Sequence, residues 1–568
     1  MLFFTSSLLA MTVNRLNGGG NIIYIDFSLP GKIVPLELVR SYNSITATSE
    51  SNGWLGAFGW GWTSPFETTL TTTPERNVIL RDGGTGNTIF FHPQKADPRA
   101  KQAFFDKLKR AFFERKYNRK MSGGELAKLQ LPSDMMARLK TESTYRLAMA
   151  DKYHIPGEVP QDELLVSSEY GYQTIRFREN QWIREKDGVT QFFDKDGRLV
   201  RQKDKNGFYF NYKYSPTQRS QLIEISDEDR SMSLKFGWRQ DRVVEVVDNR
   251  GHKAKYRYDA NANLVSVTDS NNQTYAFRYE NKKFPHLLTY VDYVSETTPK
   301  ARVYRELRYD DNGLIVYHRD KDGTEARYTY GKGTSDPEND FWTKTSLKSP
   351  SGATAEEFDE YFIRARTDGS RYLYKQLTRR AGVETTTVFT SCCGKPQQIV
   401  QNGEVTNFKY YENGLLAEKT GPKESIRLEY DPRWNKVTKV NQNGVVSTYQ
   451  YDEHGNLVQA SNNHKQAVAL HYDTLGRIRR MTDPEGKQIT FDYNDKGKPS
   501  LISEKGVGTI RIDYDPDGKI VRTETVMKKG KGRMPSQAQS QEVIRRVMSG
   551  FQNLLDIIRP AGLSLVSG

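Results

Sequence analysis

The sequence predicts a mainly β protein, built as one coiled sheet from short repeated strands. Three observations predict this class: an aromatic–acidic pair with a fixed period, alternating apolar residues between turn signals, and a composition rich in tyrosine. Of the 568 residues only 36% are apolar, yet 11% are aromatic and 32 are tyrosine. Because disordered chains are poor in aromatic residues, this polarity indicates many thin strands with one solvated face.

The repeating feature is a tyrosine followed directly by an acidic or amide residue. This pair occurs at Tyr430-Asp431, Tyr451-Asp452, Tyr472-Asp473, Tyr493-Asn494 and Tyr514-Asp515, a constant step of 21 residues. The same step separates Phe193 from Tyr214, Tyr258 from Tyr279 and Tyr309 from Tyr330, and a 20-residue step leads from Tyr410 to Tyr430. A fixed period of this length indicates a repeat architecture that buries apolar surface between neighbouring units.

Each unit is interpreted as two strands and two turns. The tyrosine ends a strand, and the acid after it accepts a backbone hydrogen bond in a turn that a glycine with positive φ tightens. In Gln488–Tyr493 the alternation puts Ile489, Phe491 and Tyr493 on one face, which is typical of a strand. One hairpin alone is marginal in water, so we expect the units to stack into a single sheet, with several small β domains as the alternative. The residues that define the repeat are Tyr258, Asp259, Tyr309, Asp310, Gly313, Tyr430, Asp431, Tyr451, Asp452, Gly455, Tyr472, Asp473, Gly476, Tyr493, Tyr514, Asp515 and Gly518.

The Tyr-Asp-x-x-Gly-x-Leu/Ile core resembles the YD repeat of bacterial Rhs proteins, which also occurs in the shells of insecticidal toxin complexes and in teneurins. Near the N-terminus, residues 26–31, 35–44 and 55–62 look like the opening domain of Rhs proteins. The resemblance covers residues 20–93 and 166–526. It implies a strand-rich spiral around a hollow interior, which in some members encloses a toxic C-terminal domain.

In members that enclose a toxin, the resemblance also implies an Asp-Pro-x-Gly cleavage motif at the toxin boundary. Asp483-Pro484-Glu485-Gly486 and Asp515-Pro516-Asp517-Gly518 have this pattern, but both lie inside the 21-residue register and lack an aromatic-rich flank. We interpret both as turns in which proline presets φ. The sequence therefore holds no evidence of self-cleavage.

Five segments are expected along the chain. They are residues 1–19 (a truncated export signal or an N-terminal strand), 20–93 (an Rhs-type β domain), 94–165 (a basic helical insert), 166–526 (the YD-repeat shell) and 527–568 (a basic linker and an amphipathic helix). The apolar start resembles a signal core but no Lys or Arg precedes it, so either the start lies upstream or the segment is a buried strand. No other stretch is long enough to cross a membrane.

The insert replaces the β alternation with apolar residues at helical spacing, and Ser122 with Glu125 forms a candidate capping box. Between Lys95 and Lys120, ten basic residues stand against three acidic ones, a net charge of +7. We expect a helical pair that either packs on the shell with a solvated basic face, binds an acidic partner or lies on an anionic membrane. The candidate partner-binding residues are Lys107, Lys109, Arg110, Arg115, Lys116, Arg119 and Lys120.

After Val526 the period stops. A basic, glycine-rich linker at residues 528–533 leads to a helix expected from Ser536 to Arg559, with an apolar stripe that includes Val543 and Val547. This stripe is expected to plug the shell, dock on it or pair with another chain.

No residue pattern points to catalysis. The eight histidines lack metal-ligand spacing, and no nucleophile elbow or phosphate loop is present. Asp194–Gly197 and Asp320–Gly323 resemble fragments of calcium loops but lack the terminal bidentate Glu, and Cys392-Cys393 are two thiols or a vicinal disulfide. We therefore expect no catalytic residue, no metal site and no cofactor, with a triad assembled only in three dimensions left open.

The sequence favours an exported or cell-surface shell protein that acts by binding, adhesion or encapsulation. The net charge of +14 attracts anionic partners, but no nucleic-acid-binding motif accompanies it, so nucleic acid is not expected as a partner. The expected partners are a glycan or protein at the shell surface, where tyrosines offer stacking, and an enclosed cargo. The alternatives are a toxin-delivery cage or remnant without its toxin domain, and an unrecognised glycan-acting hydrolase.

Overall fold

The computed structural model describes residues 11–31, 34–48, 53–93, 98–167, 172–204, 207–218, 220–295, 298–365, 371–391, 394–495, 497–515, 520–526, 541–547, 549–550 and 552. The chain divides into two compact units. The first comprises Met1–Phe27, Leu38–Lys203 and Tyr209–Val405, and the second comprises Ser28–Glu37, Asp204–Phe208 and Thr406–Gly568. Both are built from antiparallel strands, so the mainly β class is confirmed.

The N-terminal part folds into short strands and turns. Its elements are β1 (Thr12–Asn14), β2 (Gly19–Leu29), β3 (Leu36–Asn43), η1 (Ile45–Ala47), β4 (Leu55–Gly56), β5 (Gly59–Trp60), β6 (Trp62–Thr63) and η2 (Pro65–Glu67). Trp62 is fully buried, with its ring centroid 5.0 Å from that of Phe277 and 5.1 Å from that of Tyr42. The expectation for residues 1–10 lies outside the described residues.

The first unit is dominated by one antiparallel sheet in which the strands follow chain order and each pairs with the next. Its strands are β7 (Thr69–Thr72), β8 (Val78–Arg81), β9 (Thr88–Pro93), β10 (Leu165–Ser167), β11 (Gln173–Arg178), β12 (Gln181–Lys186), β13 (Val189–Phe193), β14 (Leu199–Lys203), β15 (Tyr209–Tyr214), β16 (Leu222–Asp227), β17 (Ser233–Arg239), β18 (Arg242–Asp248), β19 (Lys253–Tyr258), β20 (Leu264–Thr268), β21 (Thr274–Arg278), β22 (Tyr290–Ser295), β23 (Thr298–Tyr309), β24 (Ile315–Arg319), β25 (Glu325–Lys332), β26 (Phe341–Lys348), β27 (Thr354–Ala365), β28 (Arg371–Arg380), β29 (Val383–Phe389) and β30 (Pro396–Gln401).

The sheet that contains β7 to β9 continues beyond residue 93, where β9 ends. β9 pairs with β10, with Pro93 opposite Leu165, so these strands belong to the same sheet as the repeats. Their inward residues share one core with the first repeat strands, and Val78, Leu80, Phe91, Leu165 and Phe193 are all fully buried there. Strands β7 to β9 therefore share one sheet with the repeat strands.

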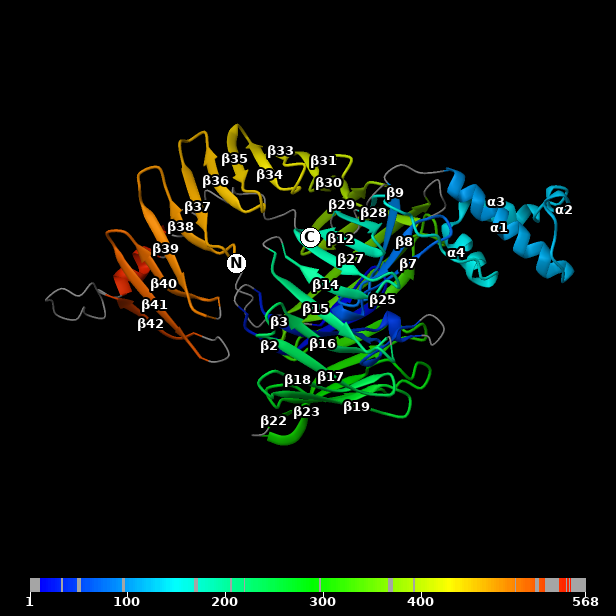
Figure 1. Ribbon diagram of the computed structural model, residues 1–568, viewed down its shortest axis with the longest axis horizontal. Coiled ribbons are helices and arrows are strands. Elements are labelled where there is room, and N and C mark those ends of the chain that lie inside the picture. The colour runs from blue at the N-terminus through cyan, green and yellow to red at the C-terminus, as the bar shows by residue number, and fades with distance from the viewer. Residues whose placement is uncertain are drawn as a thin grey trace. The chain divides into compact units, whose positions relative to one another are not determined.

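The second unit repeats the hairpin in its simplest form, and its strands follow one another as successive hairpins (Figure 1). They are β31 (Glu404–Tyr410), β32 (Leu416–Thr420), β33 (Ser425–Tyr430), β34 (Val437–Gln442), β35 (Val445–Tyr451), β36 (Leu457–Asn462), β37 (Ala467–Tyr472), β38 (Ile478–Thr482), β39 (Gln488–Tyr493), β40 (Pro499–Glu504), β41 (Gly508–Tyr514) and β42 (Ile520–Val526). Ile489 and Phe491 are buried, as the alternation predicted, and they join a continuous apolar cluster along this sheet.

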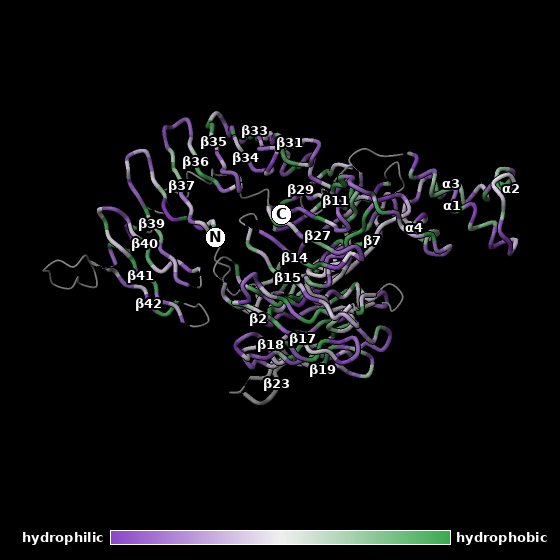
Figure 2. Tube along the Cα trace, viewed as in Figure 1, coloured by the Kyte–Doolittle hydropathy of each residue, from purple (hydrophilic) through white to green (hydrophobic). Residues whose placement is uncertain are grey.

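The insert forms helices α1 (Pro98–Tyr117), α2 (Gly123–Ala127), α3 (Ser133–Thr141) and α4 (Ser143–Lys152), which lie together beside β7 to β9 (Figure 1). The expected helical pair is wrong: α1 is followed by three short helices, because the capping box at Ser122 begins a helix that ends after one turn. Along the insert, hydrophilic and hydrophobic residues alternate (Figure 2). Phe104, Leu108 and Leu139 are buried in a core that the insert makes by itself.

The described part of the tail is helical at residues 541–547 and docks within the second unit. Val547 is fully buried, and a Cβ added at Gly508 would lie 2.7 Å from Cγ1 of Val543. Docking was one of the three expected placements of this stripe. The linker at 528–533 and Cys392-Cys393 lie outside the described residues.

Candidate functional site

The Tyr-Asp turns share one hydrogen-bonded geometry. Oδ1 of Asp452 accepts the N–H groups of His454 and Asn456 at 2.9 and 2.7 Å, and Gly455 closes the turn with a φ of +73°. The acid therefore satisfies backbone donors that a reversal would otherwise leave without partners. The same acceptor pattern recurs at Asp259, Asp310, Asp473 and Asp483.

The turn acids are stabilised as carboxylates. Burial alone would raise the pKa of Asp452, but hydrogen bonds from the Asn456 side chain and backbone outweigh it and hold the pKa below its usual value. At Asp473, a guanidinium takes the place of the amide: Nη2 of Arg477 lies 2.7 Å from Oδ2, and the pKa of Asp473 is likewise lowered against the effect of burial. The side chain four residues after the acid thus completes the turn, a role that the sequence pattern did not reveal.

The tyrosine hydroxyls make a second recurring contact, which sequence reasoning also missed. Tyr472 donates its hydroxyl to the C=O of Leu457 at 2.7 Å, and Leu457 is the first residue of β36. Tyr309 makes the same kind of bond to Leu288 at 2.7 Å. Equivalent bonds of 2.6–3.0 Å join Tyr214 to Leu199, Tyr258 to Val243, Tyr279 to Leu264, Tyr330 to Ile315, Tyr430 to Leu416, Tyr451 to Val437, Tyr493 to Ile478 and Tyr514 to Pro499.

Each hydroxyl acts where the backbone ladder stops. β36 and β37 pair at only three positions beside their tight turn, Gln459–Ala469, Ala460–Val468 and Ser461–Ala467. Leu457 and Tyr472 lie beyond these pairs, and the tyrosine hydroxyl supplies the donor that a paired N–H would give in a ladder. Three paired positions also join β18 to β19, β20 to β21, β24 to β25 and β38 to β39. The tyrosines therefore recur at the positions where paired strands separate, and each hydroxyl bonds across that separation.

These tyrosines remain hydroxyl donors at neutral pH. Burial raises the pKa of Tyr451 and Tyr493 to about 12, and it raises the pKa of Tyr258 further. In the last predicted unit, the Tyr514 hydroxyl donates to the Pro499 carbonyl. Asp515 lies within the described residues, and Gly518 lies outside them.

The N-terminal segment packs on a Tyr-Asp turn through buried polar contacts. Arg40 is fully buried, donates to both carboxylate oxygens of Asp26 at 2.9 and 3.0 Å, and lies 4.4 Å from the Trp62 ring centroid. Tyr256 of β19 donates to the same Asp26 at 2.9 Å. Trp60 N–H donates to the Ala262 C=O at 3.3 Å, within the turn that follows β19. The Gly-Trp motif thus fixes the N-terminal segment to the repeat sheet.

The seven predicted partner-binding residues lie in and just after α1, and all except half-buried Lys109 are exposed. Several are engaged within the insert or with its base: Lys107 pairs with Glu158, Arg119 with Glu125 at 2.6 Å and Arg110 with Glu114 at 3.5 Å. Residues 98–155 hold 14 basic and six acidic side chains, a net charge of +8, so this short segment carries more than half of the chain's excess charge. The insert is therefore strongly basic.

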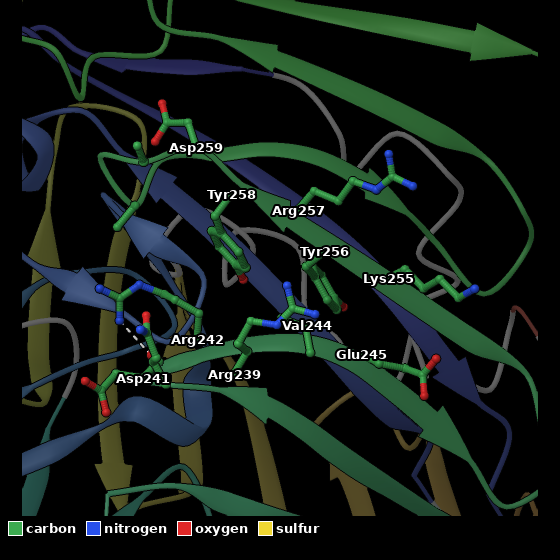
Figure 3. Close-up of a pocket in the computed structure, with 13 residues that line it drawn as sticks. Arg239, Asp241, Arg242, Val244, Glu245, Lys255, Tyr256, Arg257, Tyr258 and Asp259 are labelled. Carbon is green, nitrogen blue, oxygen red and sulfur yellow. Dashed lines mark hydrogen bonds between the residues drawn. The ribbon is translucent and has the colours of Figure 1, made fainter.

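A pocket of about 830 Å³ opens between β18 and β19 (Figure 3). Its lining residues are Arg239, Gln240, Asp241, Arg242, Val244, Glu245, Lys255, Tyr256, Arg257, Tyr258, Asp259, Ala260 and Ala262. It lies at one of the gaps that a tyrosine bridges, because Tyr258 reaches Val243 beyond the last strand pair. No sequence pattern indicated this pocket, since its charged residues come from three strands and two turns.

Among the described residues, no group of three or more His, Cys, Asp or Glu side chains could hold a metal ion, and no described helix is long and apolar enough to cross a membrane. The Asp194 segment, which resembled part of a calcium loop, is a turn: Asp194 Oδ1 accepts the N–H groups of Asp196 and Arg198 at 3.0 and 2.9 Å.

Comparison with known families and structures gives two matches to family models. Residues 391–505 match the teneurin YD-shell family, and residues 12–91 match a domain of unknown function named DUF6531. The expected resemblance to YD-repeat shell proteins is thereby confirmed. A search of curated proteins found no match.

Solved structures of Tc toxins are also similar to the chain. The Tc holotoxin pore of Photorhabdus luminescens is 10% identical over 90% of this chain, with a TM-score of 0.37. A TcdB2-TccC3 crystal structure is 11% identical over 94% of it, with a TM-score of 0.38. This chain spans only 31% of the length of either structure.

Proposed function

Because this chain carries YD-repeat shell sequence, we propose that it is an exported shell protein that acts by binding or encapsulation and has no catalytic activity of its own. The observation that carries the proposal is the regular series of Tyr-Asp hairpins, in which partly buried hydroxyl and carboxylate groups hydrogen-bond to the backbone. Groups used in this way are unavailable for proton transfer or nucleophilic attack. The repeats therefore supply surface and enclosure.

A reconstruction of the purified full-length chain by electron cryo-microscopy tests this proposal. We expect the repeat sheets to surround an interior that holds polypeptide density. Density for residues 527–568 sealed inside would favour encapsulation, whereas an open sheet with an accessible concave face would favour adhesion. A flat or dissociated arrangement with no enclosed or concave surface would contradict both, and density for a separate effector would favour the toxin-delivery alternative.

The helical insert is proposed as the partner-binding element, specifically for an acidic protein segment. Its apolar residues Phe104, Leu108 and Phe113 are buried in its own core, so α1 has no free apolar face with which to enter a bilayer. Lys116 and Lys120 are exposed, and no carboxylate among the described residues pairs with either. A solvated cation that pairs with no carboxylate is available to an acidic chain.

Binding of a labelled glutamate-rich peptide to the full chain tests this second proposal. The Lys116→Gln/Lys120→Gln variant is expected to bind several-fold more weakly, and wild-type binding should fall with added salt. Lys195→Gln/Lys321→Gln serves as the control, because it removes two exposed charges from turns elsewhere. Equal binding by all three proteins would contradict the proposal, as would stronger binding to anionic vesicles than to the peptide.

A further inference from the structure

The pocket between β18 and β19 contains an unusual placement of like charges. β17 and β18 form a hairpin in which Arg239 lies directly opposite Arg242, with only Gln240 and Asp241 between them. Like charges directly opposite each other on paired strands are destabilising. Both arginines line the same pocket, together with Lys255 and Arg257 from β19 (Figure 3).

The pocket's carboxylates form no ion pair with these cations. Among the described residues, no carboxylate lies within ion-pair distance of Arg239, Arg242, Lys255 or Arg257. Asp259 is engaged in its own turn through Asn261 and Asn263, and Glu245 lies 3.5 Å from Lys253, which is outside the pocket lining.

Arg242 is half-buried, and the fold has desolvated part of its guanidinium. Its Nε is buried and has no hydrogen-bond partner among the described atoms. Its Nη1 donates at 2.6 Å to the C=O of Asp241, so the guanidinium is held in place by the hairpin itself. A buried, oriented donor of this kind costs free energy unless an acceptor completes it.

We propose that this pocket binds an oxyanion-bearing saccharide, with the oxyanion at Arg239 and Arg242. Guanidinium groups bind carboxylate and sulfate oxygens through paired N–H donors, which matches the chemistry of two unpaired arginines. A bound anion also removes the repulsion between them. Binding at this pocket does not require the shell to enclose a cargo.

The remaining lining favours a hydroxylated ligand over an apolar one. A volume of about 830 Å³ is ample for a small oligosaccharide, but charged and amide side chains line most of it, unlike the mainly apolar pockets that hold drug-like molecules. Tyr258 is half-buried and its hydroxyl is already bonded to Val243, so it offers the pocket a ring and not a hydroxyl. A ring beside polar groups suits the mixed surface of a sugar.

Calorimetric titration of the full chain tests the proposal with four probes: trigalacturonate, a sulfated trisaccharide, neutral maltotriose and inorganic sulfate. We expect at least one of the two anionic saccharides to bind, and the carboxylated and sulfated arms distinguish the two sources of the oxyanion. The Arg239→Gln/Arg242→Gln variant should lose at least about tenfold in affinity, the effect of removing charge-assisted hydrogen bonds.

The control variant is Lys409→Gln/Arg427→Gln, which removes the same charge from two side chains that are each 73% exposed on the second unit. It should bind like the wild type, and thermal unfolding should confirm that both variants are folded. The proposal is overturned if no anionic saccharide binds the wild type, if both variants lose affinity equally, or if maltotriose or sulfate alone binds as tightly as the anionic saccharides.

Discussion

At the residue scale, the repeated tyrosine works through its hydroxyl as well as its ring. The ring is packed in the sheet, while the hydroxyl completes a backbone carbonyl on a neighbouring strand, as at Tyr472 and Leu457. This double role accounts for the choice of tyrosine over phenylalanine at the end of each strand. A phenylalanine would fill the same volume but leave the carbonyl without its donor.

Tyr472→Phe is therefore expected to lower the free energy of unfolding by about 1–2 kcal/mol, since the half-buried Leu457 carbonyl loses this hydroxyl donor. The measurement is urea-induced unfolding of the full chain. Tyr374→Phe is the matched control, because Tyr374 is 38% exposed and should change stability by less than about 0.5 kcal/mol. An equally small change at Tyr472 would show that the hydroxyl bond carries no net stability.

Glu67 is a buried carboxyl whose titration should be visible in stability. Burial raises the pKa of Glu67 from 4.5 to about 7, although hydrogen bonds from the N–H groups of Ala57 and Ser64 oppose the shift. Because the folded pKa lies above the unfolded one, the folded state holds the proton more tightly. The contribution of Glu67 to stability is thus fully present below pH 4.5 and is lost as the pH rises towards 7.

Comparing Glu67→Gln with the wild type isolates this effect. Between pH 4.5 and pH 7 the stability of the wild type relative to the variant should fall by about 3 kcal/mol, as measured by urea unfolding at each pH. Glu453→Gln, whose side chain is 81% exposed, should show no such trend. A constant difference between wild type and Glu67→Gln across this range would mean that Glu67 is ionised in the folded state.

At the scale of elements, the turn glycines have two separate reasons to be glycine. Gly455 and Gly486 have φ values of +73° and +80°, so a side chain at either position is strained. A Cβ at Gly455 would also lie 2.8 Å from the Trp434 ring, whereas nothing lies within 4 Å of a Cβ at Gly486. The first glycine therefore serves conformation and packing, and the second serves conformation alone.

Gly486→Ala is expected to cost about 1 kcal/mol of unfolding free energy, and Gly455→Ala distinctly more because Trp434 must move. Chemical denaturation of the two variants side by side provides the measurement. The pair is its own control, since both carry the same backbone strain. Equal losses would show that Trp434 gives way without cost.

The insert is attached to the sheet by a buried ion pair. Arg146 of α4 is 4% exposed, and its Nε lies 2.6 Å from Oε1 of Glu75, in the connection between β7 and β8. Removing one member of a buried pair leaves a desolvated charge behind. The exposed pair of Arg138 and Glu142, within the insert, offers a contrast.

Arg146→Met should destabilise the insert by about 3–5 kcal/mol, read from thermal loss of the helical circular-dichroism signal. Adding Glu75→Gln should recover part of the lost stability, because it removes the carboxylate that Arg146→Met leaves without its ion-pair partner. Arg138→Met should cost less than about 1 kcal/mol. If Arg146→Met and Arg138→Met behave alike, the buried pair does not hold the insert.

At the scale of the whole molecule, the insert interrupts a β-hairpin without disrupting it. Pro93 of β9 and Leu165 of β10 are paired even though the entire insert lies between them in the chain. The insert buries its apolar residues in its own core, so sheet and insert are expected to fold as separate units.

Replacing residues 98–155 with a flexible Gly/Ser linker should therefore leave the sheet folded. We expect loss of the helical signal, retention of the β signal and hydrogen-exchange protection in β9 and β10, and loss of acidic-peptide binding. A variant in which β9 and β10 exchange freely would show that the sheet depends on the insert.

Local patterns predicted the repeat well. The tyrosines end their strands, the acids accept turn hydrogen bonds, and the glycines take positive φ, as the 21-residue register indicated. The helical insert was also found, through its apolar spacing and the capping box at Ser122. These features depend on contacts between residues close in sequence, so one chain segment contains all the information they need.

Other features were decided by the tertiary structure alone. The Asp26–Arg40–Tyr256 contacts, the pairing of β9 with β10 and the pocket of Arg239 and Arg242 each join residues whose proximity no local period records. The sequence by itself determined the hairpin, because turn chemistry and alternation are local. Only the tertiary structure decided where strands part, which carbonyl each tyrosine reaches and which charges are left facing one another, because those depend on the packing of separate segments.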